Sequence, residues 1–316
     1  MRIFIIATTA AAALFSFPAF TQDRNQPGAS PPDLSGVWAN PYLYGIEPPP
    51  SGPGPVVNKA RRRQTLDPDG KPLTAANAPL VSDNTKLVGD YANPILRPEA
   101  AEVVKKHAEM SLAGLGYPSP RNQCWPQGVP FIFTNAALLL LQQPGKITMV
   151  YDEDHEVRRI RMNAPHPAQV PPSWYGDSVG HYEGDTLVVD TVGLKIGPFS
   201  AVDQYGTPYT QALHVVERYR LIDYEAAREA WRRGGRENIR GGAVNEGWAP
   251  DPGYRGKALQ LQFTVEDEGV FTTAWSAAKT YRRVFRDWPE RACAENPYRY
   301  GTEKDAAVPT AVRPDF

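Results

Sequence analysis

Short apolar runs of strand length, separated by turn residues, dominate the chain from about residue 130 onward. They are rich in Val, Ile, Leu, Phe and Tyr, and turn sequences such as "QPGK" stand between them. This pattern predicts sequential antiparallel strands. Seven or eight twisted strands without alternating helices close into a barrel or split into a sandwich, so we expect a mainly β fold of one of these types. The runs lie at 131–135, 137–143, 146–153, 156–163, 178–191, 212–222, 257–267 and 271–285.

Two segments have helical rather than strand patterning. The stretch "RPEAAEVVKKHAEMSLAGLG" places Pro98 at a favourable first helical position and reaches a stop at Gly114 or Gly116. The stretch "DYEAAREAWRRGG" has Asp223 as an N-cap and Gly234 as a stop. We therefore expect one helix before the strands and one inserted among them.

The N-terminal third is irregular apart from its helix. The chain contains 32 prolines, about twice the average share of ~5%. The stretch "EPPPSGPGP" at 47–55 excludes a helix or a central strand there. "DLSGVW" at 33–38 is the expected start of the folded part. We expect residues 22–119 to form a Pro-rich lead-in, loops and a helix packed on an antiparallel β domain of residues 120–316.

Residues 1–21 have the form of a secretory signal peptide. One Arg precedes an apolar run of roughly 15 residues, and small residues follow it. A membrane anchor is the alternative, but spanning needs roughly 20 apolar residues and Pro18 ends this run early. We therefore predict a periplasmic or extracellular protein with no integral membrane segment after cleavage. In that compartment Cys124 and Cys293 either form one disulfide or remain two buried thiols.

Charge and motifs exclude several classes of function. The chain has 34 basic and 35 acidic side chains, so no domain-wide basic field exists for binding nucleic acid. The sequence contains no G-x-S-x-G elbow, no P-loop, no HExxH and no GxGxxG after a strand. We expect no cofactor and no metal. The acidic turn "DEDHE" at 152–156 lacks the spacing of a calcium loop and is expected to be solvated.

Residues 178–191 predict a tight hairpin with Gly184 and Asp185 at a type II′ turn. Side-chain alternation gives this hairpin a polar face and a more apolar face, and the apolar face should meet the core. The polar face carries Val179, His181, Glu183, Thr186, Val188 and Asp190, and the other carries Ser178, Gly180, Tyr182, Leu187, Val189 and Thr191.

His181 and Asp190 are diagonal neighbours in this register, so their side chains could bond. A His–Asp pair suits general acid–base chemistry, because the carboxylate orients the imidazole and raises its basicity. The pair is a catalytic candidate if the polar face lines a barrel lumen. It is a solvated surface if that face meets bulk water.

The strand at 212–222 places Glu217 among apolar neighbours. A buried carboxylate is costly unless it is paired, so Glu217 is either an acid–base group or, more commonly, the structural partner of an arginine. The run at 156–163 places Arg159 and Arg161 on one face, opposite Arg158 and Ile160. These guanidiniums could hold Glu217 or recognise an anionic ligand.

Two further histidines complete the candidates. His166 lies in the Pro-flanked loop "NAPHPAQVPPSW", where the alternative is an ordinary surface histidine, and His214 lies on the strand that carries Glu217. His107 is expected on a helix surface. The catalytic candidates are therefore His166, His181, Asp190, His214 and Glu217. Seven Trp and 15 Tyr supply amphipathic lining, and the ligand-binding candidates are Trp174, Tyr182, Arg159, Arg161 and Tyr219.

The chain contains the motifs "SWYGDSVGHYEGDTLVVDT", "LHVVERYR" and "RACAENPYRYG", and "LSGVW" near the expected start of the folded part. These motifs resemble those of a widespread family of uncharacterised secreted proteins of Gram-negative bacteria. The resemblance covers roughly residues 120–316. It implies a secreted, β-rich protein and carries no reaction or catalytic set. The chain departs from the family pattern at His181-Tyr182, where Arg-Trp is usual, and this shifts weight from His181 to His166, His214 and Glu217.

Two functions remain open from the sequence. The first is a barrel-like protein whose pocket takes a small, partly apolar molecule, aromatic among the options. If such a protein is an enzyme, a His and a carboxylate move protons in a cofactor-free lyase, isomerase or hydrolase step. The second is a non-catalytic envelope module that binds a protein or carbohydrate partner through its Pro-rich loops. The first requires at least two of His166, His181, His214 and Glu217 to converge on an enclosed cavity. The sequence leaves the ligand and the oligomeric state open.

Overall fold

The structure is a computed structural model. It describes residues 31–39, 46–65, 71–76, 78–83, 85–134, 137–153, 156–234, 253–285, 292–293, 298–299 and 304–305. The predicted signal peptide lies outside these residues. In the part of the chain that is described, no helix has both the length and the apolar character needed to cross a membrane.

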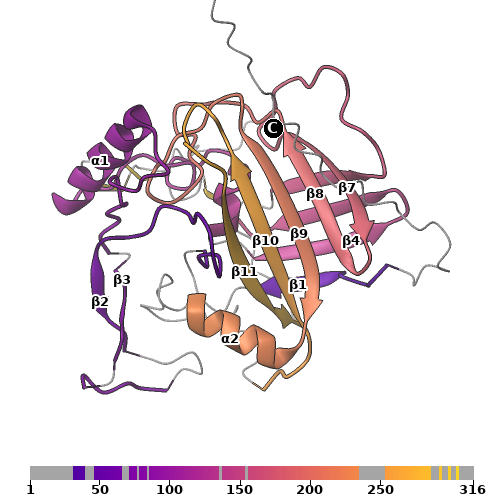
Figure 1. The fold of residues 1–316 in the computed structure, drawn as a ribbon, viewed down its shortest axis with the longest axis horizontal. Helices are drawn as coiled ribbons and strands as arrows, with labels where there is room; N and C mark the ends of the chain where they lie inside the picture. The colour runs from indigo at the N-terminus through magenta and orange to yellow at the C-terminus, as the bar shows by residue number, and fades with distance from the viewer. Residues whose placement is uncertain are drawn as a thin grey trace, which may run out of the picture. The chain divides into compact units, whose positions relative to one another are not determined.

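Nine of the described strands close into a barrel, the first of the two predicted alternatives (Figure 1). Around the barrel the order is β1-β11-β10-β9-β8-β7-β6-β5-β4, and β4 pairs with β1 to close it. The strands are β1 (Gly36–Ala39), β4 (Leu138–Gln143), β5 (Lys146–Tyr151), β6 (Val157–Met162), β7 (Asp177–Glu183), β8 (Thr186–Val192), β9 (His214–Ile222), β10 (Ala258–Glu266) and β11 (Trp275–Val284).

The number of strands in the barrel explains why one pair is parallel, although sequential antiparallel strands were predicted. A closed ring of strictly alternating strands needs an even number, so nine strands force one parallel pair. That pair is β6–β7, and the crossover 163–176 joins its two strands. β1 is the strand that the sequence count did not include, because it lies in the segment predicted to pack on the barrel. Residues 131–135, predicted as a strand, instead contribute the 3₁₀ helix η1 (Phe131–Thr134).

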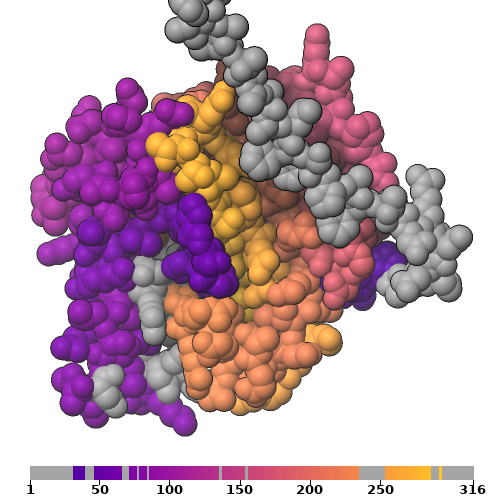
Figure 2. Space-filling model, in the orientation of Figure 1, coloured from indigo at the N-terminus to yellow at the C-terminus, as the bar shows by residue number. Residues whose placement is uncertain are grey.

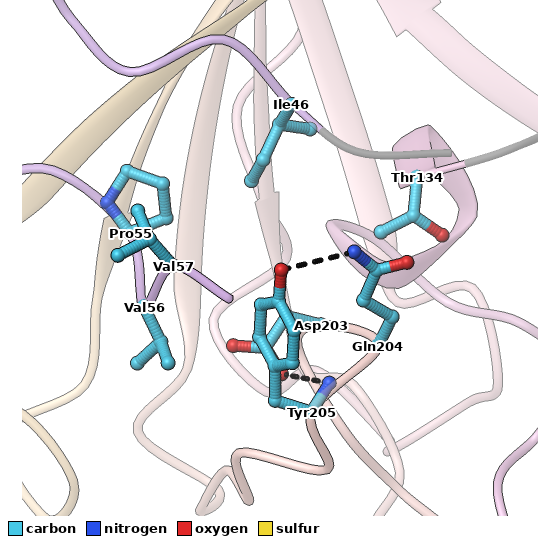
Figure 3. Close-up of a pocket in the computed structure, with 8 residues that line it drawn as sticks. All are labelled: Ile46, Pro55, Val56, Val57, Thr134, Asp203, Gln204 and Tyr205. Carbon is cyan, nitrogen blue, oxygen red and sulfur yellow. Dashed lines mark hydrogen bonds between the residues drawn. The ribbon is translucent and has the colours of Figure 1, made fainter. Parts of the chain in front are cut away.

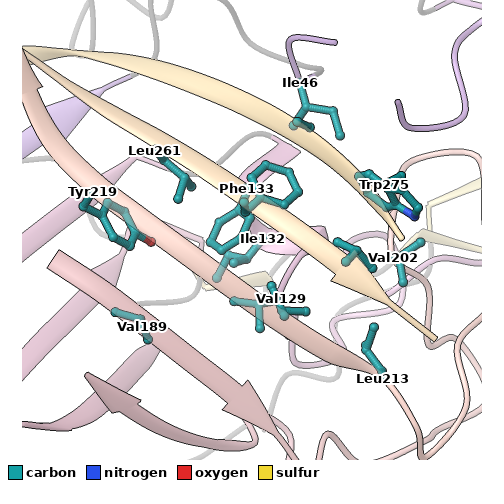
Figure 4. Packing of buried hydrophobic residues seen from close by; sticks show 14 of the residues in the cluster. Ile46, Val129, Ile132, Phe133, Val189, Val202, Leu213, Tyr219, Leu261 and Trp275 are labelled. Atoms are coloured by element: carbon teal, nitrogen blue, oxygen red, sulfur yellow. The ribbon is translucent and has the colours of Figure 1, made fainter. Parts of the chain in front are cut away.

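The barrel interior is a packed core. All four residues of η1 are buried, and they enter the barrel at the end where β4, β7, β9 and β11 begin. Phe133 lies against Phe263 of β10 with ring centroids 5.0 Å apart. Figure 4 shows Phe133 and Ile132 from η1 among the inward side chains of the sheet, including Tyr219 and Leu261. Such close packing leaves the centre of the barrel filled by the protein's own side chains.

Both predicted helices form. α1 (Pro98–Leu112) has Pro98 in its first turn, and Gly114 follows it with φ +79°, the left-handed conformation that ends many helices. α1 lies at the end of the barrel where η1 enters, which is called the α1 end below (Figure 1). α2 (Tyr224–Gly234) packs on β10 and β11, and Trp231 donates a hydrogen bond of 2.9 Å to the carbonyl of Thr280.

The N-terminal third contains more structure than the predicted loop. β2 (Arg61–Arg63) and β3 (Leu80–Ser82) form a two-stranded ribbon beside the barrel. Residues 46–57 run along β11, where Glu47 exchanges two backbone hydrogen bonds with Ala278. Figure 2 shows this segment, in indigo, lying on the yellow strands. A separate ribbon joins β12 (Tyr298–Arg299) and β13 (Lys304–Asp305).

Candidate functional site

The hairpin of β7 and β8 has the predicted register and faces. Glu183 pairs with Thr186, His181 with Val188, and Val179 with Asp190. Gly184 has φ +61°, as the first central position of a type II′ turn requires. The apolar face points into the core, so the polar face that carries His181 and Asp190 lies on the outer wall of the barrel.

Three catalytic candidates meet on this outer wall, around one oxygen atom. Asp190 Oδ1 lies 3.2 Å from His166 Nε2 and 3.0 Å from His214 Nε2. The second nitrogen of each ring faces another carboxylate. His166 Nδ1 is 2.6 Å from Asp177 Oδ1, and His214 Nδ1 is 3.3 Å from Glu266 Oε2. These five side chains form a row across β7, β8, β9 and β10, called the outer row below, with His166 supplied by the crossover.

Each histidine of the outer row lies between two carboxylates. A neutral imidazole has a single N–H, and a carboxylate can only accept. Each ring therefore satisfies both of its carboxylate neighbours only when it carries two protons. Among the residues that the structure describes, no group of three or more His, Cys, Asp and Glu side chains has the geometry to hold a metal ion.

His181 does not bond to Asp190, contrary to the expectation from the hairpin. It is half exposed and instead lies 3.2 Å from Glu183 on its own strand, because Asp190 turns toward the two other histidines. Arg218 of β9 also contacts Glu183, and this contact is the largest cause of the lowered pKa of the Glu183 carboxyl. His181 therefore belongs to a solvated surface pair.

Glu217 points inward as predicted, but its partner is Arg158 rather than Arg159 or Arg161. The two side chains are 0% and 1% exposed, and Arg158 donates to both carboxylate oxygens at 2.8 and 3.0 Å. The reason is strand alternation: Arg158 shares the inward face of β6 with Ile160, so Arg159 and Arg161 are exposed. Arg161 pairs with Asp177, an acid of the outer row, at 2.7 Å.

Hydroxyl groups complete the shell around this buried ion pair. Tyr219 donates to Glu217 Oε2 at 2.7 Å, and Arg158 donates to Ser178 and Thr191 at 3.0 Å each. Burial opposes the charge of Arg158, but the facing carboxylate more than compensates, so the pKa of the guanidinium lies above its ordinary value. Burial, and next Glu217, raise the pKa of Tyr219. This network is a buried structural centre that closes Glu217 and Tyr219 off from ligand, and within it Arg158 Nε is left without a hydrogen-bond partner among the described residues.

The two remaining ligand-binding candidates lie apart from each other. Tyr182 is half-buried, and its hydroxyl accepts a hydrogen bond of 2.6 Å from Gln142 of β4. Trp174 lies in the crossover that also carries His166. Its ring has Lys195 Nζ above it at 4.7 Å and Trp125 edge-on at 5.1 Å. Of the five ligand-binding candidates, Trp174 is the one that belongs to an aromatic cluster outside the core.

The acidic turn is not solvated at its two ends. Asp152 and Glu156 are 6% and 7% exposed, and residues 154–155 lie outside the described part. Asp152 accepts a hydrogen bond from the backbone of Ala137, and Glu156 accepts one from the backbone of Gln127. These carboxylates hold the chain before and after η1 against the barrel, and the sequence pattern had not indicated this role.

A small space lies beside the core at the α1 end (Figure 3). Its volume is about 10 Å³, room for one water molecule. Asp203 lies in its wall and is fully satisfied by Thr207 and by the backbone of Tyr205. Burial raises the pKa of Asp203, and these hydrogen bonds oppose the shift. The space is too small for an organic ligand.

A second, half-open pocket of about 260 Å³ lies at the α1 end. It is bounded by α1, by the chain after it, and by the loop between β8 and β9. None of the residues that line it is Asp, Glu, Lys or Arg, and its walls consist of aromatic rings, prolines and small residues. The lining residues are Val103, His107, Tyr117, Pro118, residues 196–201, Gly206, Pro208 and Tyr209.

His107 lines this pocket, where an ordinary helix surface had been expected. Its ring is stacked on Tyr117, with centroids 4.4 Å apart and an interplanar angle of 17°. Nδ1 lies 3.3 Å from the carbonyl oxygen of Tyr205, which can only accept, so Nδ1 carries the proton. Burial lowers the pKa of His107 and favours the neutral ring. Nε2 then keeps its lone pair.

A close backbone approach holds the ring of His107 in place. Gly206 has φ +75°, and a Cβ atom there would lie 2.0 Å from His107 Nδ1. A glycine is therefore required at this point of the loop. A sequence signal for His107 did exist, since His107 comes three residues after Val104 and seven after Ala100, two buried residues of α1. That spacing places it at the edge of the buried helix face.

The aromatic cluster around Trp174 supports the wall of the pocket. Trp125 lies edge-on to Trp174 and to Phe199, whose ring centroid is 5.7 Å away. Cys124, next to Trp125, forms the disulfide with Cys293, which resolves the two alternatives left open by the sequence. Trp125 thus connects the pocket wall to the segment that the disulfide holds.

Comparison of the chain with protein families, with curated proteins and with solved structures gives no match. The resemblance to a family of secreted proteins stays a prediction.

Proposed function

We propose that this protein binds a small, partly apolar molecule in the pocket at the α1 end. The observation that carries the proposal is the pocket itself: a half-open space of about 260 Å³ lined by Tyr117, Phe199 and Tyr209 together with three prolines. Ligand sites are typically concave, mostly apolar and supplied with a few polar groups. An apolar cavity of only ~150 Å³ is enough to hold benzene, so a substituted aromatic ring fits here.

The barrel interior is the competing location, and its packing argues against it. Arg158 and Glu217 fill the centre with each other and with hydroxyl groups, and η1 occupies the α1 end of the lumen. A ligand inside would have to displace a buried ion pair, which is costly because each partner would lose its counter-charge. The ends of barrels and the loops around them remain the favourable place for a site.

We further propose that the protein works in an oxidising compartment, periplasmic or extracellular. The signal-like N-terminus supports this location. The bond between Cys124 and Cys293 supports it as well, because structural disulfides persist mainly in such compartments.

The test is a thermal-shift screen of aromatic, glycosidic and acidic small molecules against the mature protein. We expect aromatic compounds to raise the midpoint, and Val103→Trp to remove the shift because Val103 lines the pocket from α1. Lys106→Trp places the same side chain on the exposed face of the same helix and should leave the shift intact. Shifts by glycosides alone would favour the carbohydrate-binding alternative. Shifts unchanged by Val103→Trp would contradict the proposed site.

A second candidate function, proton transfer in a cofactor-free reaction, is favoured by the shared contact of His166 and His214 with Asp190. Neither of the two cavities described above includes these residues, so the convergence on an enclosed cavity that the sequence-based hypothesis required is not found in the described part of the chain, and the binding proposal rests on the pocket at the α1 end alone. The test is turnover of 4-nitrophenyl acetate, a hydrolase probe, by the wild type and by His214→Ala. A loss of at least ~100-fold at an unchanged thermal midpoint would support this candidate, because general acid–base groups contribute about that much or more. Equal rates would exclude it for this reaction.

A further inference from the structure

Three polar groups in the wall of the α1-end pocket, those of Tyr117, Tyr209 and His107, already donate their protons to backbone carbonyls. Tyr209 donates its hydroxyl proton to the carbonyl of Lys195 at 2.9 Å. His107 uses its Nδ1 proton on the carbonyl of Tyr205. The Ser200 hydroxyl accepts from the backbone of Gly197 at 2.8 Å and lies against the Tyr209 hydroxyl. The wall therefore offers a ligand mainly hydrogen-bond acceptors.

His107 is the strongest of these acceptors. Its side chain is the one nitrogen-bearing side chain among the residues that line the pocket. The carbonyl of Tyr205 fixes the tautomer, and stacking on Tyr117 fixes the plane of the ring. A neutral imidazole held in this way accepts at Nε2. The ring lies close to the backbone at Gly206, and this contact together with the hydrogen bond to Tyr205 presets its direction.

The absence of charged side chains from the lining bears on the charge of the ligand. Taking an ionised carboxylate or ammonium out of water is unfavourable unless an opposite charge receives it. None of the residues lining the pocket supplies such a charge at neutral pH. Lys195, the residue before Ile196 of the pocket wall, places its ammonium over the ring of Trp174. The pocket therefore favours an uncharged molecule.

Resting on the proposed function, we infer that the ligand is an uncharged aromatic molecule of the phenol class, whose hydroxyl donates a hydrogen bond to Nε2 of His107. The ring packs between the aromatic and proline walls, and the donor makes the one directed polar contact. A hydroxyl is selected over a methyl group of the same size because the methyl leaves His107 Nε2 without a donor.

The experiment is calorimetric titration of the full chain with 4-methylphenol, with 1,4-dimethylbenzene, in which a methyl replaces the hydroxyl, and with 4-methylbenzoate, which is charged. We expect 4-methylphenol to bind about ten-fold more tightly than 1,4-dimethylbenzene, the effect of one hydrogen bond. We expect 4-methylbenzoate to bind least. His107→Phe keeps an aromatic ring beside Tyr117 and should abolish the preference while 1,4-dimethylbenzene still binds. Lys106→Phe, on the exposed face of α1, should preserve the preference.

The outcomes separate this inference from the proposed function. Equal affinities of the wild type for 4-methylphenol and 1,4-dimethylbenzene would overturn the phenol class and leave the pocket as an apolar binding site. Tightest binding by 4-methylbenzoate would overturn it as well. If none of the three binds, the inference fails, and the Val103→Trp comparison in the thermal-shift screen decides whether the proposed function fails with it. The wild-type ratio stands as a test even if His107→Phe does not fold.

Discussion

The interior pair and the outer row both join carboxylates to basic side chains, but in opposite environments. Inside, Glu217 and Arg158 are 0% and 1% exposed and bind each other through two hydrogen bonds. Outside, Asp190 is 40% exposed, and the two histidines that contact it are 24% and 32% exposed. Strand alternation alone decides which carboxylate is buried, because Asp190 and Glu217 lie on adjacent strands and point to opposite faces of the sheet. The comparison teaches that burial, rather than residue type, determines whether a carboxylate serves the structure or remains accessible to solvent and ligands.

The largest effect that this comparison predicts comes from Glu217→Gln. The substitution leaves Arg158 buried without its counter-charge, and removal of one partner of a buried ion pair costs about 3–5 kcal/mol. Urea denaturation should show a loss of this size in the free energy of unfolding. The double substitution Arg158→Met with Glu217→Leu should recover most of it, because it removes both charges. A loss under ~1 kcal/mol for Glu217→Gln would mean that the pair is not desolvated as described.

A second buried carboxylate extends the comparison to pH. Burial raises the pKa of Glu47 from 4.5 to about 7, with Thr280, Arg233 and Lys279 opposing the shift. Because the folded state binds this proton more tightly than the unfolded state, stability falls as the pH rises from 4.5 to 7. Glu47→Gln should remove that fall and make the variant more stable than the wild type at pH 8, by on the order of 3 kcal/mol.

The measurement is the difference in unfolding free energy between Glu47→Gln and the wild type at pH 5, 6, 7 and 8. Taking the difference cancels the titrations of groups that do not interact with Glu47. Lys279 is the exception, because burial lowers its pKa to about 7 and Glu47 opposes that shift, so the substitution changes the Lys279 titration as well. Lys279 works in the opposite direction, since stability rises with pH between 7 and 10.5 for a lysine with a lowered pKa. A difference that stays constant across the four pH values would contradict the burial of Glu47.

Asp190→Asn should have the smallest effect on stability. The outer row is partly exposed, and exposed ion pairs contribute about 0–1 kcal/mol each. The loss in unfolding free energy should stay within this range and shrink in ~1 M salt, where screening is strong. A loss comparable to that of Glu217→Gln would show that the outer row is as structural as the interior pair, and the distinction between them would fail.

The sequence predicts the parts of the fold that local patterns encode. The hairpin register, the inward position of Glu217 and both helices follow from alternation, turn residues and caps. The parallel pair β6–β7 does not, because it depends on how many strands close the ring, and β1 is only four residues long. The short "FIFTN" run has β-forming composition but becomes η1, because tertiary packing into the barrel end outweighs propensity.

The candidate site was less predictable than the fold. The meeting of His166 and His214 at Asp190 requires the crossover to fold back over β7 and β8, and no periodicity indicates where a Pro-rich loop goes. The pocket joins residues 103–118 to residues 196–209, two segments far apart in the chain, so its lining could not be assembled from the sequence. Helix patterning did contain a usable signal for His107, at the edge of the buried face of α1.

The most direct test of where this protein binds is backbone hydrogen exchange with and without saturating 4-methylphenol. We predict slower exchange in residues 103–118 and 196–209, which contribute the pocket wall, and unchanged exchange in β6 and β9 around the interior ion pair. Slower exchange centred on β6 and β9, or on the crossover that carries His166, would contradict a binding site at the α1 end.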